Sequence, residues 1–289
     1  MPDFKFLIPD IEEVSRRARQ DHENAKSLFL DQELFIGVSL GAWLDEVRAA
    51  GIAHVPATQI FMLDRMDYLQ FDDLQLCAQT KLAELEAIVA STPKDHMVRW
   101  DACADIGLKF AMGEGAAHER ENALSLGDPR AYSIIYDYPA DTIPVWSRPW
   151  HQAKYHGCFP IEFRVFVRDS EITGVANYYV QRELPDNAEI RGYAQKCWTA
   201  AGDLIHRMNE RKRRPWMPNY VGLDAQKIHA TLDFLICAQT GQALFLEAGP
   251  PFGCGAHPCA FMHSGKPNGI ALNGMPVVAN IPDGGARAA

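Results

Sequence analysis

The sequence predicts an α+β protein, and three patterns along the chain carry this prediction. Apolar residues recur with helical periodicity through much of the first third of the chain. Further along, short segments alternate between apolar and charged residues, as the strands of half-buried hairpins do. A long helical segment then separates these strands from a last strand pair within residues 228–249. Long helices and antiparallel hairpins in separate runs are typical of the α+β class.

Four segments have the periodicity of helices: residues 10–30, 32–50, 72–89 and 188–213. Gly51 ends the second helix, since glycine is the usual residue just past a helix end. Pro215 and Pro218 end the last one, because proline lacks the backbone donor that a helix interior needs.

Seven strands are predicted between and after these helices: residues 59–63, 97–100, 108–112, 132–136, 143–147, 162–168 and 171–179. The last two form the clearest hairpin, with a turn at Asp169 and Ser170. The final pair turns through Gln239-Thr240-Gly241, with the glycine in the left-handed conformation. The tail from Gly265 is rich in Gly, Pro, Asn and Ala, and we expect irregular structure there.

Composition excludes several broad classes. The 289 residues are 47% apolar, enough to bury a large core, and the net charge of −9 argues against general nucleic-acid or membrane binding. The sequence has no apolar run long enough for a transmembrane helix, and seven scattered cysteines fit reduced thiols in a cytoplasm. Residues 211–214 are a basic run, interpreted as the solvated end of a helix or, alternatively, as a patch that contacts phosphates.

Asp233 and Glu247 are the most informative pair of residues. The register set by the Gly241 turn places them opposite each other on adjacent strands, with Leu232, Phe234, Leu244 and Leu246 on the other face. Facing carboxylates repel unless a positive group neutralises them, and Mg²⁺ held together with substrate phosphates would do so. Removing either carboxylate should then leave the metal-free protein at least as stable. The alternative is two unrelated, hydrated carboxylates.

A charged strand face offers phosphate ligands. Ile161, Phe163, Val165 and Val167 share one face of their strand, whereas Glu162, Arg164, Phe166 and Arg168 share the other. An arginine that faces a cleft from a sheet binds phosphate well because its donors form a rigid fork. The alternative is an exposed Glu162–Arg164 ion pair, which contributes little to stability.

Two other segments complete a candidate nucleotide site. Arg99 and Lys109, on neighbouring predicted strands before a loop at residues 113–115, can hold phosphates. The strand at residues 143–150 runs into an aromatic–proline turn whose edge can meet adenine; the alternative is a core strand capped by a tryptophan. No serine, cysteine or histidine nucleophile stands out in the sequence.

These pieces, in this order, resemble the ATP-grasp superfamily, most clearly over residues 97–255. The Glu162–Val167 segment is most similar to the phage and bacterial branch with paired arginines and to the eukaryotic cell-division-cycle assembly factors. The resemblance implies two α+β lobes that enclose an ATP cleft behind a helical N-terminal part. It divides the chain into an N-terminal lobe (1–95), a small lobe with the adenine hinge (96–150), a C-terminal lobe with the metal site (151–264) and a tail (265–289).

The resemblance also implies roles for individual residues. Arg99, Lys109 and Arg164 contact phosphates, with Lys109 and Arg164 at the reacting centre, while Trp146, Ser147 and Arg148 meet adenine and Asp233 and Glu247 hold Mg²⁺. Many family members have an asparagine two residues after the metal-binding acid, where this chain has Gly249. One metal ligand is therefore absent or supplied elsewhere, for example by Asn177 or solvent.

We therefore expect a cytoplasmic, ATP- and Mg²⁺-dependent ligase that joins a carboxylate to an amine through an acyl phosphate. Such chemistry depends on positioning and charge neutralisation, which agrees with the absence of a nucleophile. The alternatives are an ATP-binding assembly factor with little turnover and an ATP-dependent enzyme that modifies a peptide or nucleic acid. The basic run weakly favours a polyanionic partner.

Overall fold

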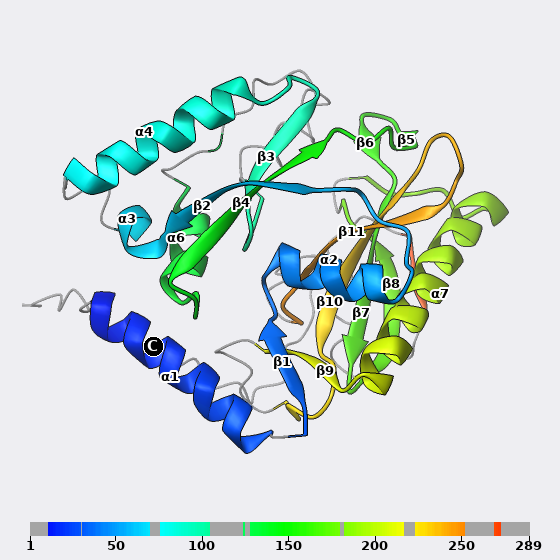
Figure 1. Cartoon of the computed structure of the whole chain (residues 1–289). Helices are drawn as coiled ribbons and strands as arrows, with labels where there is room; N and C mark the ends of the chain where they lie inside the picture. The colour runs from blue at the N-terminus through cyan, green and yellow to red at the C-terminus, as the bar shows by residue number, and fades with distance from the viewer. Residues whose placement is uncertain are drawn as a thin grey trace, which may run out of the picture.

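The structure is a computed structural model that describes residues 11–29, 31–69, 76–104, 124, 128–179, 182–216, 223–251 and 269–272. Its helices are α1 (Ile11–Leu28), α2 (Leu40–Ala49), α3 (Arg65–Leu69), α4 (Leu76–Ser91), α6 (Pro129–Tyr136) and α7 (Ala188–Glu210). Helices and mostly antiparallel sheets occur together, which confirms the α+β class (Figure 1).

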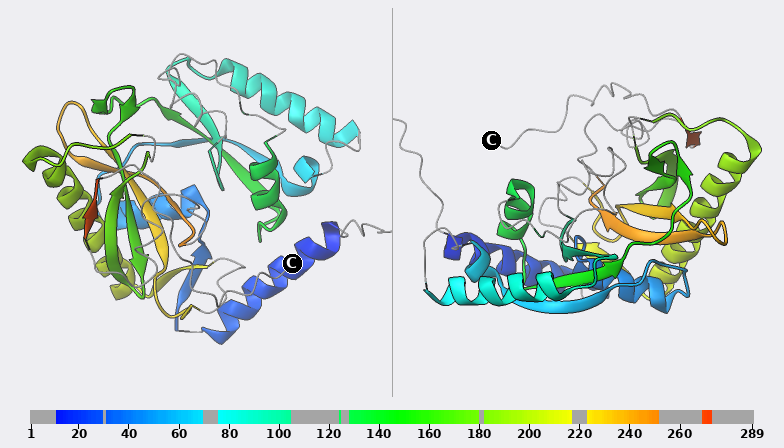
Figure 2. Two further views of the ribbon diagram at one scale, coloured as in Figure 1. Left: turned by 180° about the vertical axis from the view of Figure 1, so that it is seen from behind. Right: turned by 90° about the horizontal axis from the view of Figure 1, so that it is seen from above.

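A five-stranded sheet forms the larger half of the molecule. Its strands, in spatial order, are β11 (Ala243–Gly249), β10 (Ala230–Ile236), β7 (Glu162–Arg168), β8 (Glu171–Asn177) and β12 (Ile270–Ala271). One face of this sheet packs against α7 and α2, and α7 lies along its outer side (Figures 1 and 2). Phe163, Val165 and Val167 belong to this core, as the strand alternation predicted.

A three-stranded sheet forms the smaller half. It consists of β2 (Thr58–Asp64), β4 (Thr142–Pro149) and β3 (His96–Trp100), in that order, and its core includes residues of α3, α4 and α6. β2 and the β3–β4 pair lie on opposite sides of the boundary expected at residues 95 and 96, yet they form one sheet. The short strands β5 (Tyr155–His156) and β6 (Phe159–Pro160) follow β4 and lead to the larger sheet.

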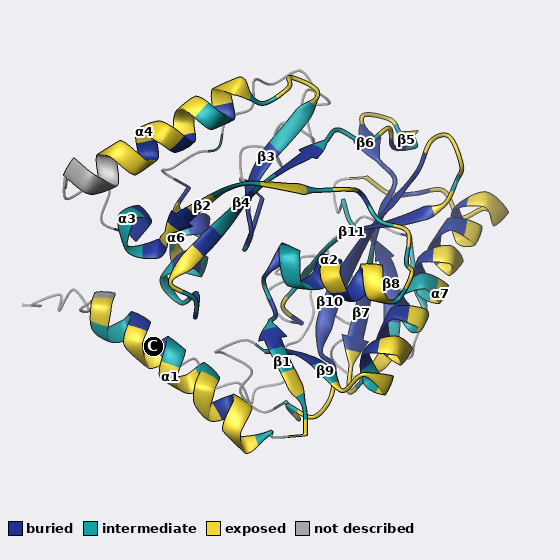
Figure 3. Cartoon of the chain, in the orientation of Figure 1, coloured by how far each residue is buried: buried dark blue, intermediate teal, exposed yellow. Residues whose placement is uncertain are grey.

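The burial pattern explains why these segments form helices. α4 and α7 are exposed on their outer sides and buried on the sides that face the sheets (Figure 3). On α7 the buried positions Tyr193, Ala194, Cys197, Ala201, Leu204 and Met208 recur every three to four residues. Among the described residues, no helix combines the length and apolar composition needed to cross a bilayer.

Two hairpin predictions are confirmed. Asp169 and Ser170 have φ angles of 54° and 64°, the positive values that a tight two-residue hairpin turn requires. Gly241 has the expected positive φ, 62°, but Cys237 N donates to the Gln242 carbonyl, so the last loop comprises residues 238–241 and is one residue longer than Gln239-Thr240-Gly241. Local turn chemistry therefore determines both connections.

Three element predictions are wrong. Residues 132–136 belong to helix α6 and not to a strand: Asp128 caps the helix through Arg130 N and Ala131 N, and Pro129 begins it. Residues 33–36 form strand β1, although a helix was expected there; β1 pairs in parallel with β9 (Arg213–Trp216), which begins at the last residue of the expected helix 188–213. A short strand, β12, lies within the tail expected to be irregular. The strand expected at residues 108–112 lies outside the described residues.

The basic run at residues 211–214 is held within the fold. Arg211 Nη1 and Arg213 Nε donate to the Glu46 carboxylate at 3.0 and 2.7 Å, and Glu46 is only 1% exposed. Arg214 is buried and donates to the Gln226 carbonyl at 2.7 Å. Arg211, the C-cap of α7, and Lys212 are exposed, as expected for a solvated helix end, whereas Arg213 and Arg214 belong to strand β9 and are partly or fully buried.

Candidate functional site

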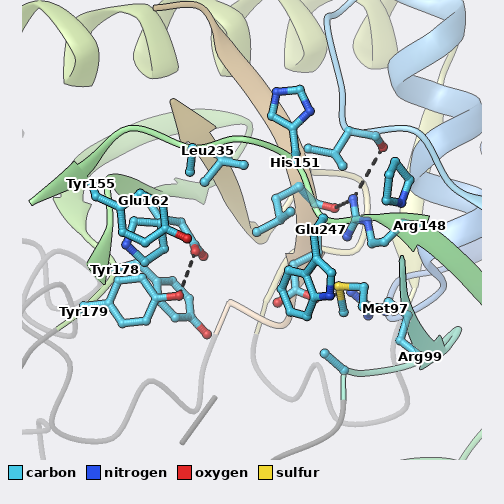
Figure 4. A pocket seen from close by; sticks show the side chains of 17 residues that line it. Met97, Arg99, Arg148, His151, Tyr155, Glu162, Tyr178, Tyr179, Leu235 and Glu247 are labelled. Carbon is cyan, nitrogen blue, oxygen red and sulfur yellow. Dashed lines mark hydrogen bonds and ion pairs between the residues drawn. The ribbon is translucent and has the colours of Figure 1, made fainter. Parts of the chain in front are cut away.

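A cavity of about 110 Å³ lies where the two sheets meet (Figure 4). Its apolar wall takes residues from both sheets and from the segment that joins them: Val55, Met97, Trp150, Ala153, Leu235 and Leu246. Strand pairing places Met97 on β3, whereas Leu235 and Leu246 lie on β10 and β11. The cavity therefore depends on the packing of segments that are far apart in the sequence.

Charged side chains line the same cavity. Arg99 and Arg148 come from the smaller sheet, and Glu162 and Glu247 come from the larger one. Arg148 is 1% exposed; its Nη2 donates to the Leu246 carbonyl at 3.0 Å, while its Nε is buried without a hydrogen-bond partner. Burial lowers the pKa of Arg148 to about 9, so this guanidinium remains charged at neutral pH.

The predicted juxtaposition of Asp233 and Glu247 is confirmed, and a β-bulge produces it. Continuous pairing from Ile236 and Ala243 would place Leu246 opposite Asp233. The register shifts between Asp233 and Phe234, so Glu247 becomes the partner of Asp233 instead. The bulge therefore brings two carboxylates together at one position of the sheet.

The bulge also corrects the expected apolar faces. Phe245, and not Leu244 or Leu246, shares the main core with Leu232 and Phe234. Leu244 and Leu246 pack instead in a small cluster with Val55, Ala153 and Leu235. A strict alternation along the strand could not show this, because the extra residue reverses the faces on one side of the bulge.

Each of the two carboxylates is paired with its own arginine. Both oxygens of Asp233 accept hydrogen bonds from Arg164, from Nε and Nη2, each at 2.7 Å. Glu247 Oε2 accepts from Arg99 Nη1 at 2.5 Å. Arginines therefore neutralise the facing carboxylates without any metal, so the two acids have structural partners. This removes the basis for expecting the protein to be as stable without either acid.

Arg164 lies on β7 directly beside Asp233 in the register, and it is 15% exposed. Its guanidinium also lies over the Tyr178 ring, 4.7 Å from the ring centroid. Arg164 therefore forms a partly buried ion pair with Asp233, and not the exposed ion pair with Glu162 that was the alternative. Contact of Arg164 with phosphate stays a prediction.

Glu162, Trp150, His151 and Leu235 line the cavity but were not among the predicted site residues. Glu162 is 4% exposed and accepts a hydrogen bond from the Tyr179 hydroxyl at 3.2 Å. Burial raises the pKa of the Tyr179 phenol, which therefore stays protonated and able to donate. The sequence did contain a signal for Glu162, a carboxylate on the same strand face as Arg164.

Of the three residues of β4 that were expected to meet adenine, only Arg148 lines the cavity. Trp146 does not; its Nε1 donates to Asp101 at 2.6 Å, and its indole covers Gly41, where a Cβ would meet it at 2.6 Å. Ser147 points to the other face of β4 and bonds His96 Nδ1 at 2.9 Å. Lys109 lies outside the described residues.

The third metal-ligand position was left open by the sequence. Gly249 pairs with Thr231, and a Cβ at Gly249 would lie 3.2 Å from Thr231 Oγ1, so a side chain there needs Thr231 to move. Asn177 pairs with the core residue Phe163, on the opposite face of the sheet from Asp233, and its amide nitrogen donates to the Tyr179 and Arg182 carbonyls. Asn177 therefore cannot complete a site at Asp233.

The donor set fits a magnesium ion that is shared with a ligand. Asp233 and Glu247 supply carboxylate oxygens from adjacent strands, and Mg²⁺ is commonly held by one or two carboxylates together with phosphates. Across the described part of the chain, no group of three or more His, Cys, Asp or Glu side chains is placed to hold a metal. The two carboxylates thus suit an ion that arrives with phosphate oxygens.

A scan against models of protein families finds no match, and neither does a comparison with curated proteins. Among solved structures, the chain is similar to C-terminally truncated Cdc123 from Schizosaccharomyces pombe, with 11% identity and a TM-score of 0.46, over 83% of this chain and 99% of that one. It is similar to the D-alanine–D-alanine ligase of Bacillus anthracis complexed with ATP, with 12% identity and a TM-score of 0.33, over 79% and 59% of the two chains.

A third similar structure is the ATP-grasp ligase PsnB complexed with a precursor peptide and AMPPNP, with 13% identity and a TM-score of 0.29, over 75% of this chain and 50% of that one. The chain thus spans 59% of the D-alanine–D-alanine ligase and 50% of PsnB. These likenesses concern the fold alone.

Proposed function

We propose that the cleft between the sheets binds ATP with Mg²⁺ and that the chain is a ligase of the carboxylate–amine class. One observation carries this proposal: an apolar cavity lies beside two arginine–carboxylate pairs, Arg99–Glu247 and Arg164–Asp233, and the first of these pairs lines the cavity. An apolar cavity suits a nucleobase, and arginine forks beside carboxylates suit a triphosphate with its metal ion.

In this proposal the base occupies the cavity beside Leu235, Leu246 and Arg148. Arg99 and Arg164 turn toward the phosphates, together with Lys109. Asp233 and Glu247 hold Mg²⁺, whose role is to neutralise charge on the phosphate oxygens. The protein's contribution is to position the reactants and to keep water away from the transferred phosphoryl group.

The proposed reaction needs no protein nucleophile. The γ-phosphoryl group passes from ATP to a carboxylate, which gives ADP and an acyl phosphate. The nitrogen of an amine then attacks the acyl carbon, the bond to the phosphate oxygen breaks, and inorganic phosphate leaves. Arg164 is suited to the first step because its fork can follow a phosphate as charge moves between oxygens.

The contact at Gly249 favours a second candidate, an ATP-binding assembly factor with little turnover. The position where many ATP-grasp ligases have an asparagine carries no donor here, and Thr231 lies too close for a side chain to fit without movement. Binding with a single metal ion and without efficient phosphoryl transfer would follow.

Calorimetric titration with AMPPNP and Mg²⁺ tests the shared part of both proposals, with saturable binding expected. Turnover then separates them. A ligase hydrolyses ATP slowly alone and releases ADP and phosphate when supplied with the correct carboxylate from a metabolite panel. Slow hydrolysis that no carboxylate stimulates favours the assembly factor, and release of AMP and pyrophosphate contradicts the acyl-phosphate route.

A further inference from the structure

We infer that Arg99 and Arg164 occupy the two carboxylates in the nucleotide-free protein and thereby make metal binding depend on the nucleotide. This inference rests on the proposed function. The arginines hold the places that a metal ion would need, and they release the carboxylates only when a triphosphate offers them new partners. Mg²⁺ alone would then bind poorly, and Mg²⁺ with nucleotide would bind well.

The geometry of the Arg164–Asp233 pair supports this exchange. Asp233 is 1% exposed and uses both of its oxygens to accept from Arg164, each at 2.7 Å. A metal ion approaching this carboxylate must therefore displace a bidentate, charge-assisted contact. Arg164 lies over the ring of Tyr178, which lines the cavity, and its side chain is 15% exposed, so a ligand that extends from the cavity can reach it.

The Arg99–Glu247 pair adds a connection between the sheets. Arg99 lies on β3 of the smaller sheet and is 3% exposed, whereas Glu247 lies on β11 of the larger sheet and is 17% exposed. Their contact of 2.5 Å joins the two sheets at the cavity that both residues line. A phosphate that takes Arg99 frees Glu247 for the metal ion and breaks this contact between the sheets.

Charge balance around the cleft points the same way. Arg99, Arg148 and Arg164 face Glu162, Asp233 and Glu247, so the six charges cancel. A divalent cation alone would add uncompensated positive charge in a partly buried place, and a triphosphate alone would draw the arginines away and leave Asp233 and Glu247 facing each other. The opposite charges of the two ligands offset each other when both are bound, so each favours the binding of the other.

The test measures the binding of Mn²⁺, which prefers the same oxygen ligands as Mg²⁺ and is followed by the EPR signal of the free ion. The parent protein should bind Mn²⁺ alone weakly. Arg164→Met removes the guanidinium and should bind Mn²⁺ alone at least about tenfold more tightly, within the usual range of coupling between sites. Arg99→Met should show the same gain in affinity for Mn²⁺. It leaves Glu247 without its arginine, and Glu247 is more exposed than Asp233, so this variant replaces Arg164→Met in the test if Arg164→Met folds poorly.

Arg168→Met is the matched control. Arg168 is the last residue of the same strand, its side chain is 44% exposed, and its Nε lies 3.6 Å from an oxygen of Asp169. The control makes the same change in net charge away from the carboxylates, so its affinity for Mn²⁺ should equal that of the parent. Circular dichroism verifies the folding of each variant before titration.

Complexes of Mn²⁺ with AMPPNP distinguish the possible failures. Both arginine variants should bind the complex more weakly than the parent, although they bind the bare ion more tightly. If the parent binds the complex but neither arginine variant gains affinity for Mn²⁺ alone, the inference is wrong and the proposed function stands. If the parent binds no nucleotide with or without Mn²⁺, the proposed function itself fails, and the inference fails with it.

Discussion

Replacing Asp233 with asparagine should destabilise the protein in the absence of nucleotide, because it leaves the partly buried Arg164 without its carboxylate. Asp233 is 1% exposed and accepts two hydrogen bonds of 2.7 Å from Arg164. Breaking a buried ion pair by removing one partner costs roughly 3–5 kcal/mol. Arg164 keeps 15% exposure and its contact with Tyr178, which reduce the loss. We therefore expect about 2–3 kcal/mol for Asp233→Asn.

The assay is a thermal melt without nucleotide and with a chelator. For a protein of this size, the expected loss corresponds to a fall in Tm of roughly 5 °C. Asp203→Asn is the control, because Asp203 is exposed on α7 and its replacement makes the same change in net charge. The free energy of unfolding of this variant should stay within about 0.5 kcal/mol of that of the parent. If Asp233→Asn melts at or above the parent temperature, carboxylate repulsion dominates and the pairing argument is refuted.

Three other predictions follow from the same contacts. Arg164→Lys keeps the charge but loses the fork, so it should weaken AMPPNP–Mg²⁺ binding by about tenfold or more in calorimetry; equal affinity would exclude Arg164 as a phosphate ligand. Burial lowers the pKa of His229 below its ordinary value of 6.5, so the free energy of unfolding should fall as pH drops below about 6.5, because the unfolded chain binds the proton first. Thermal melts at several pH values in this range should show a smaller loss of Tm for His229→Gln than for the parent; an equal loss would contradict the assignment to His229. Glu46→Gln leaves Arg211 and Arg213 without their buried partner, but both arginines are partly exposed and Arg213 still pairs with Glu33, so it should cost about 1–2 kcal/mol in denaturant titration. A loss under about 0.5 kcal/mol would show that the pairs contribute little.

Local patterns predicted the hairpins but not the elements that depend on tertiary contacts. The alternation in Glu162–Arg168 and the Asp169–Ser170 turn are local signals, and the structure confirms both. Residues 132–136 contain isoleucines and tyrosines that favour strands, yet the cap at Asp128 starts a helix there. Strand β1 has only four residues, and its backbone hydrogen bonds depend on β9, which lies about 180 residues further along the chain.

The site was predictable to a similar extent. The facing of Asp233 and Glu247 was predicted from a loop of residues 239–241, whereas the observed loop is one residue longer and a β-bulge restores the predicted pairing. The pairing of Arg99 with Glu247 joins residues 148 positions apart, on different sheets, and no local pattern contains that information. Trp146 looked suitable for adenine, but Asp101 and Gly41 hold its indole away from the cavity.

A structure of the protein with AMPPNP and Mg²⁺ tests the central claim most directly. The account predicts the base in the cavity beside Leu235 and Leu246, the metal ion on Asp233 and Glu247, and the guanidinium groups of Arg99 and Arg164 on phosphate oxygens. A nucleotide bound elsewhere on the chain would contradict the proposed site. A nucleotide in the cavity with both arginine–carboxylate pairs intact would contradict the proposed exchange.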